Sequence, residues 1–89
     1  MKTNMPQISD FYGIVIFMNF RDHNPPHFHA WYREYKVSVN ISDGMVKGEM
    51  PSRALQMIKE WLALHRDELT ANWEKAGQGK PLDKISPLK

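Results

Sequence analysis

Apolar and polar side chains alternate in short runs over the first half of the chain, and this period predicts β-strands. Residues 11–20 carry apolar side chains at both alternating positions, which predicts one strand covered on both faces, by two layers or by one layer and an oligomer partner. Residues 27–33 and 35–41 are predicted as the second and third strands. An Asp43-Gly44 turn then leads to a fourth strand over residues 45–50, because Asp-Gly tolerates the positive φ of tight hairpins.

The second half of the chain changes to a helical period. Residues 52–76 contain no glycine or proline, and apolar side chains recur there at helical spacing. Pro51 is suited to the start of a helix, and Gly77 and Gly79 are suited to its end. We expect one long helix, with a break near residues 65–67 and a second helix capped by Asp67 as the alternative. The extended tail is expected to dock on the body through its spaced apolar residues Leu82, Ile85 and Leu88.

Four strands followed by a helix predict an α+β fold: a four-stranded antiparallel β-meander with a long C-terminal helix, or two helices, packed on one face and an extended C-terminal tail. A chain of 89 residues allows one domain, expected over residues 5–88, with a flexible N-terminus at residues 1–4. The chain has no cysteine, which excludes disulfide scaffolds, zinc ribbons and thiol enzymes.

The composition places the chain in a broad class without naming a function. No apolar run reaches the roughly 18–20 residues of a membrane span, and residues 1–7 lack the apolar core of a signal peptide, so we expect a cytoplasmic protein without a membrane partner. The net charge of +2 is compatible with nucleic acid as a partner but does not require it, because the basic residues are scattered.

Three of the four histidines fall within seven residues, in the stretch His23-Asn24-Pro25-Pro26-His27-Phe28-His29. On a strand, His27 and His29 project from the same face, with their Cα atoms about 6.5–7 Å apart. The two prolines stiffen the loop, which lowers the entropic cost of folding His23 back towards this pair. The three imidazoles could therefore bind a divalent metal such as zinc and leave a position open for water, with Asp22 as a further ligand or an orienting partner.

Two other interpretations of this cluster stay open. In the first, His23, His27 and His29 catalyse acid–base chemistry on phosphoryl groups without a metal, assisted by Arg21, Arg33 or Arg53, while Trp31, Tyr32 or Tyr35 stacks on a base. In the second, Phe28, Ala30 and Tyr32 face the core and the histidines are ordinary surface groups. His65 lies on the apolar stripe of the helix, where a partly buried structural histidine is expected; it joins the cluster if the helix crosses the histidine face of the sheet.

The same residues carry a resemblance to a known family. The segments Phe11-Tyr12-Gly13-Ile14-Val15-Ile16, Asp22-His23-Asn24-Pro25-Pro26-His27-Phe28-His29-Ala30, Leu64-His65-Arg66-Asp67-Glu68-Leu69 and Asn72-Trp73 resemble the bacterial domain-of-unknown-function family 4160. The resemblance extends over residues 5–88. It implies that His23, His27 and His29 form the site, with Asp22 and His65 in support. Trp31 departs from the family, in which that position is often acidic or smaller, so a metal site here depends on histidines and Asp22.

The family resemblance also implies a protein partner, because its members look like halves of two-gene modules similar to toxin–antitoxin pairs. Our first hypothesis is therefore a toxin, a small histidine-dependent hydrolase of nucleic acid that acts with or without a metal. The second is a non-enzymatic, antitoxin-like or regulatory module that binds the cognate small protein encoded by an adjacent gene. The third is a metal-binding protein of another role. The short chain and its two-sided first strand are also compatible with a homodimer.

Overall fold

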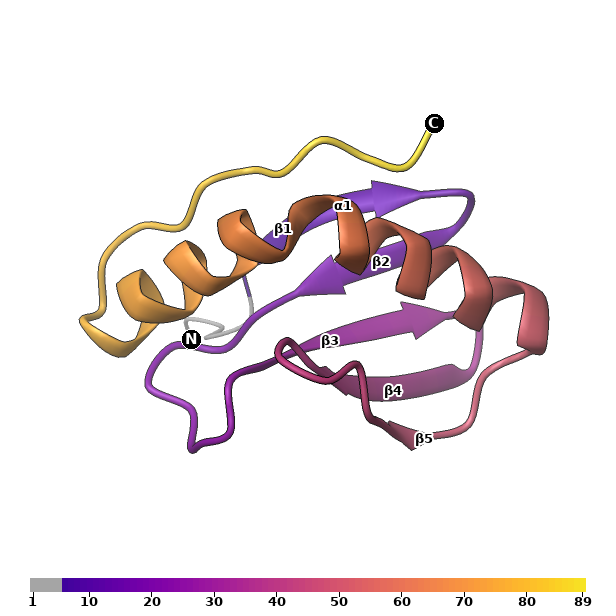
Figure 1. Ribbon diagram of the computed structural model, residues 1–89, viewed down its shortest axis with the longest axis horizontal. Helices are drawn as coiled ribbons and strands as arrows, with labels where there is room; N and C mark the ends of the chain where they lie inside the picture. Colours follow the sequence, from indigo (N-terminus) through magenta and orange to yellow (C-terminus); the bar gives the residue numbers. More distant parts are fainter. Residues whose placement is uncertain (1–5) are drawn as a thin grey trace.

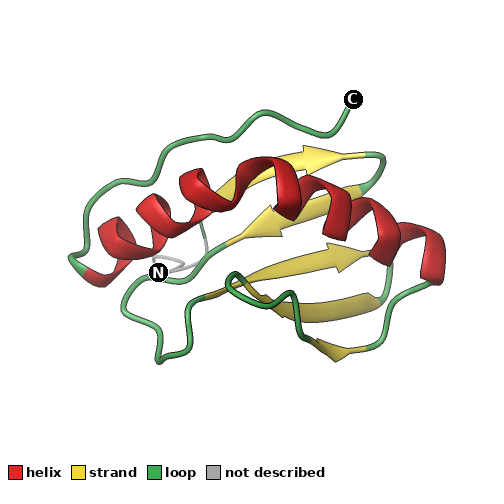
Figure 2. Ribbon diagram, viewed as in Figure 1, coloured by secondary structure: helices red, strands yellow, loops and turns green. Residues whose placement is uncertain are grey.

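The computed structural model describes residues 6–89 as one antiparallel sheet and one helix. The strands are β1 (Gln7–Phe11), β2 (Ile14–Phe17), β3 (His27–Tyr32), β4 (Tyr35–Asn40) and β5 (Val46–Gly48), and the helix is α1 (Ser52–Gly77). The strands neighbour one another in chain order, so the sheet is a meander, and α1 crosses one of its faces (Figures 1 and 2). The α+β class is confirmed, with five strands where four were predicted. The predicted flexible segment at residues 1–4 lies outside the described residues.

The prediction of a single strand over residues 11–20 is wrong. Phe11 pairs directly with Ile14, so Tyr12 and Gly13 form the two-residue turn between β1 and β2. Both turn residues have positive φ, 53° and 83°, which is the conformation of a type I′ hairpin turn. Gly13 is the sequence signal for this turn, since glycine adopts positive φ without a steric cost. The strand that the prediction missed is β1.

The other predicted elements agree with the structure more closely. β3 and β4 each end within a residue of the predicted strands, and β5 is shorter than predicted. The turn before β5 is held by bonds from the Gly44 N–H to the Asn40 carbonyl and from the Met45 N–H to the Asp43 carboxylate, both 2.9 Å long. Gly44 has a φ of 73°, as the Asp-Gly pair predicts.

The core lies between α1 and one face of the sheet. Phe28 and Ala30 of β3 are fully buried there, together with Ile58, Trp61 and Leu62 of the helix. Trp61 packs against Phe28 with ring centroids 5.6 Å apart. The helix covers only this face in the described chain, so the predicted second cover over the strand at residues 14–17 is not found. Phe17 is instead buried on the far face beside His29 and Trp31.

The helix combines the two predicted forms. Residues 52–77 are continuous, but His65 has non-helical backbone angles (φ −127°, ψ 24°) that kink the helix at the predicted break. Beyond α1, the tail runs back beside the helix and β1 (Figure 1), and the prediction that it docks is confirmed. Ile85 is buried and its N–H donates to the Ile8 carbonyl at 2.8 Å, while the indole N–H of Trp61 donates to the Ser86 carbonyl at 2.8 Å. Within residues 6–89, no helix is both long and apolar enough to cross a membrane.

Candidate metal centre

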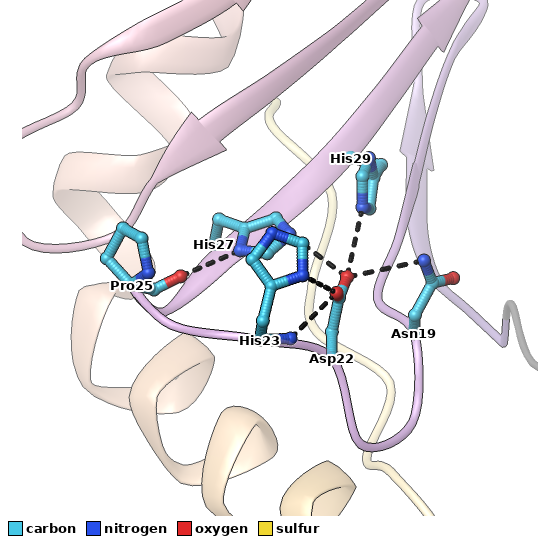
Figure 3. Close-up of polar contacts among 6 residues, drawn as sticks. All are labelled: Asn19, Asp22, His23, Pro25, His27 and His29. Atoms are coloured by element: carbon cyan, nitrogen blue, oxygen red, sulfur yellow. Dashed lines mark hydrogen bonds and ion pairs between the residues drawn. The ribbon is translucent and has the colours of Figure 1, made fainter.

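The histidine cluster forms where the β2–β3 loop enters β3. Alternation along β3 turns Phe28 towards α1 and His29 to the opposite face, while His27, the first residue of the strand, lies between the His29 ring and Trp73 near the end of α1. The loop before β3, which contains a cis peptide bond between Asn24 and Pro25, carries Asp22 back beneath the two rings (Figure 3). The site is therefore assembled from one strand and the loop immediately before it.

Asp22 occupies the centre of this cluster (Figure 3). Its Oδ1 accepts the backbone N–H of His23 at 2.8 Å and lies 3.0 Å from Nδ1 of the His23 ring. Its Oδ2 lies 3.1 Å from Nε2 of His27, 3.6 Å from Nε2 of His29 and 3.4 Å from Nδ2 of Asn19. The Asp22 side chain is only 15% exposed, so one largely enclosed carboxylate faces all three predicted histidines.

The hydrogen bonds of His27 determine which of its nitrogens faces the site. Its Nδ1 lies 2.7 Å from the Pro25 carbonyl oxygen. A carbonyl oxygen can only accept a hydrogen bond, so Nδ1 carries a proton and donates this hydrogen bond to Pro25. The other nitrogen, Nε2, faces Oδ2 of Asp22 at 3.1 Å. A histidine that donates one N–H to a carbonyl and offers the other nitrogen is the usual arrangement of a metal ligand.

His29 offers a second nitrogen without a partner. Its Nε2 is buried and makes no hydrogen bond among the described residues, since the 3.6 Å to Asp22 is too long for one. The ring stacks on Phe17 at 5.2 Å and meets the His27 ring edge-on at 5.1 Å, so its orientation is fixed by packing. Burial, with the neighbouring His27, lowers the pKa of His29 despite the opposing effect of Asp22, which favours the neutral ring that a metal requires.

The carboxylate is also held in its ligand form. Burial by itself raises the pKa of Asp22, but the His23 N–H, the charge of His27 and the contacts with Asn19 and His29 outweigh it, and the pKa of Asp22 lies below its usual value. The carboxyl group is therefore ionised at neutral pH. A carboxylate and two imidazoles are the donor set of many catalytic metal centres.

Two of the separations among these atoms match those of ligands around one metal ion. One nitrogen each from His27 and His29 and one oxygen from Asp22 lie within 4.8 Å of one another. Two ligands of a tetrahedral zinc ion, each at roughly 2.1 Å, are about 3.4 Å apart. The separations of 3.1 Å and 3.6 Å from Oδ2 to the two imidazole nitrogens bracket this value.

Asp22, His27 and His29 form the trio of candidate ligands. The remaining predicted site residues lie around this trio or away from it. The side chain of His23 is 87% exposed and contacts the other oxygen of Asp22, so it borders the trio from the solvent side. The guanidinium of Arg21 lies against Gly79. His65 contacts Glu68 at 2.5 Å and packs on Trp61, on the opposite face of the sheet from His29. The structure does not bring Arg21 or His65 into the cluster.

Three contributors to the site were not predicted. The Pro25 carbonyl and the Asn19 amide hold His27 and Asp22 through loop geometry, which has no sequence signal. Trp73, interpreted from the sequence as a packing residue, has its ring 5.2 Å from the ring of His27. It also lines a cavity of about 200 Å³ with Asn19, Asp22, Asn24, Ala76 and Gly77, which leaves room for water beside the carboxylate.

Comparison with known proteins places this arrangement in a family. A family model described as Domain of unknown function (DUF4160) matches residues 13–74, more than half of the chain. Neither the curated proteins nor the solved structures gave a match. The matched range includes Asp22, His27 and His29 and most of α1, so the whole candidate centre lies inside it. The chain therefore belongs to the DUF4160 family.

Proposed function

We propose that the protein binds a divalent metal such as zinc through Asp22, His27 and His29 and acts as a small metal-assisted hydrolase. The observation that carries the proposal is the convergence of three donor atoms, one of them the buried Nε2 of His29, which has no hydrogen-bond partner among the described residues. The contacts of His27 disfavour a metal-free mechanism through that ring. Its side chain is only 10% exposed, and both of its nitrogens contact acceptors within the protein, the Pro25 carbonyl and Asp22.

The residues around the trio would divide the chemistry. A bound zinc ion lowers the pKa of a coordinated water to about 7 and so supplies hydroxide at neutral pH. Asp22, His27 and His29 would hold the ion. The hydrogen bond between Nδ1 of His27 and the Pro25 carbonyl would fix the ring, so that Nε2 faces the ion. His23 is exposed and oriented by Asp22 at 3.0 Å, so its imidazole is suited to deliver a proton to a leaving group.

We propose nucleic acid as the substrate and a toxin of a two-gene module as the biological role. The net charge of +2 supports a polyanionic substrate, and phosphodiester hydrolysis is a reaction that metal-bound hydroxide performs. The partner proposed for this role is the cognate small protein encoded by an adjacent gene. We expect this partner to suppress the hydrolysis of nucleic acid.

Metal binding is tested first, because hydrolysis depends on it. Untagged, metal-free protein is titrated with zinc by calorimetry, and we expect one ion per chain. Asp22→Asn, His27→Ala and His29→Ala should each abolish or greatly weaken binding, whereas His65→Gln, which also removes a histidine, should not. His23→Ala should retain zinc. Wild-type protein that takes up no zinc, or equal binding by the trio variants, would refute the metal centre.

Hydrolysis and toxicity are tested on the same variants. We expect zinc-loaded protein to cleave single-stranded RNA or DNA, with activity lost in the trio variants and lowered in His23→Ala at unchanged zinc affinity. Induced expression should slow the growth of a bacterial host, and co-expression of the adjacent gene should restore it. Growth arrest that persists in His27→Ala, or zinc-loaded protein that cleaves neither polymer, would contradict the hydrolase. A stable complex with the neighbouring protein, unaffected by the trio variants and without activity, would favour the regulatory module.

A further inference from the structure

A cavity lies at the end of the molecule opposite to the histidine cluster. It has a volume of about 780 Å³, within the roughly 300–1,000 Å³ of small-molecule sites. Figure 1 shows the β1–β2 and β3–β4 turns and the start of α1 together at this end. Tyr32, which lines the cavity, is five residues after His27 on β3, or about 17 Å along the strand. The cavity is therefore separate from the candidate metal centre.

Two guanidinium groups give the cavity a basic character. Arg33 from the β3–β4 turn and Arg53 from the first turn of α1 both line it. In the part of the chain that the structure describes, neither has a carboxylate within ion-pair distance, although Glu60 lines the same cavity. The first turn of α1 has no acidic side chain, so the positive end of the helix adds to these charges. An anion that enters the cavity meets two unpaired cations.

Three tyrosines also line the cavity. Tyr12, Tyr32 and Tyr35 all face the cavity, and the Arg33 guanidinium lies 5.1 Å from the centre of the Tyr32 ring. Flat rings beside guanidinium groups are the combination that binds a nucleobase together with its phosphate. Glu60 can accept a hydrogen bond from a base amino group or a ribose hydroxyl.

The backbone reinforces this interpretation. Tyr12 and Arg33 adopt positive φ, 53° and 56°, at the two hairpin turns that border the cavity. Bulky side chains rarely adopt this conformation, and residues held in it cluster at ligand sites. Glycine or asparagine would suit both turns better, yet each turn places an aromatic or cationic side chain against the cavity.

We propose that this cavity binds a nucleotide, with the base among the three tyrosines and the phosphate between Arg33 and Arg53. The ligand can be a free nucleotide or the 5′-phosphorylated end of a strand, since both present the same chemistry. The inference does not depend on the proposed metal centre, because no residue is shared between the two sites.

The test is calorimetric titration of the full chain with AMP, with EDTA present so that phosphate cannot bind through a metal. We expect one AMP per chain, and adenosine or inorganic phosphate about tenfold weaker or worse. Arg53→Gln and Arg33→Gln should each weaken AMP binding about tenfold. Lys59→Gln removes one positive charge from the same helix outside the cavity and should leave binding unchanged. His27→Ala should also leave it unchanged.

The source of the ligand is resolved by 5′-phosphorylated and unphosphorylated trinucleotides. Tighter binding of the phosphorylated trinucleotide than of AMP identifies a strand end, and equal or weaker binding identifies the free nucleotide. Circular dichroism confirms that each variant is folded. Absence of AMP binding, unchanged binding in the Arg33→Gln/Arg53→Gln double variant, or phosphate binding as tight as that of AMP would each overturn the proposal.

Discussion

The substitution Asp22→Asn separates a metal centre from a purely structural cluster, because it removes the charge of Asp22 and keeps its shape. If His27 is a metal ligand, the lone pair of its Nε2 faces Oδ2 of Asp22 at 3.1 Å in the metal-free protein, and these two acceptors repel. An asparagine amide can instead donate to Nε2 while its carbonyl oxygen accepts the His23 N–H, now held at 2.8 Å by the carboxylate.

The magnitudes follow from these contacts. The new hydrogen bond to His27 contributes about 0.5–1.5 kcal/mol, and exchanging a charged for a neutral acceptor of the His23 N–H costs about 1 kcal/mol. We therefore expect the free energy of unfolding of metal-free Asp22→Asn to lie within about 1 kcal/mol of wild type. With zinc at a hundred times its dissociation constant, wild type gains about 2.7 kcal/mol, or roughly 10–20 °C in Tm, and the variant gains little.

The assay is urea denaturation at pH 8, followed by tryptophan fluorescence, with EDTA or with zinc. Asp67→Asn, an exposed aspartate on α1, is the matched control and should behave as wild type in both conditions. Breaking a buried ion pair costs about 3–5 kcal/mol. A loss of that size in metal-free Asp22→Asn, with no zinc-dependent gain in wild type, would show that Asp22 and His27 form a structural ion pair and would refute the reasoning.

Three further predictions concern pH, the tail and the sheet. The pKa values of both His29 and Asp22 are lowered in the folded protein, so the unfolded chain binds protons at these groups more readily. Urea denaturation of the metal-free protein should therefore show a free energy of unfolding that falls as the pH drops below about 6.5. A constant free energy of unfolding down to pH 4 would contradict this. Asn72→Ala removes the bond that the buried Asn72 amide donates to the Asp83 carbonyl and the bond that it accepts from the Asp83 N–H. It should lower the free energy of unfolding by about 1–3 kcal/mol in the same assay, whereas no loss would mean that the tail docks without these bonds. Gly48→Ala places a methyl group 2.4 Å from the backbone oxygen of Lys36 at a φ of 107° and should lower Tm. Gly77→Ala, which adds its methyl group in open space, is the control and should not lower Tm; equal Tm values for the two variants would refute the steric argument.

The extent to which the sequence predicts the fold depends on how local the signal is. The period of two over β3 and β4 and the period of 3.6 over α1 are local, so these elements were predicted within a residue or two. The turn at Tyr12-Gly13 was missed because apolar residues continue on both sides of Gly13 and mask the end of one strand and the start of the next. Here Gly13 marks a turn although the apolar run continues past it.

The candidate site shows the same limit. Alternation along β3 placed His27 and His29 on one face, which needs only the pleat of a strand. The central position of Asp22 depends on the path of the β2–β3 loop, and so does the outward position of His23. Loop paths are set by backbone bonds such as the one that ties Arg21 N–H to the Ala76 carbonyl at 3.1 Å, a contact between residues far apart in the sequence. The predicted trio of histidines thus became a trio of two histidines and an aspartate.

The helix gives the two ends of the molecule opposite electrostatic preferences. Its C-terminal residues Ala76 and Gly77 line the small cavity beside Asp22, where the negative end of the helix and the carboxylate both favour a cation. Its first turn lies in the basic cavity, where the positive end and two arginines favour an anion. The dipole acts only within the first and last turns, and effects of sites more than about 10 Å apart are usually additive. Zinc affinity should therefore be the same with and without AMP, and a mutual dependence would mean that the kink at His65 couples the two ends.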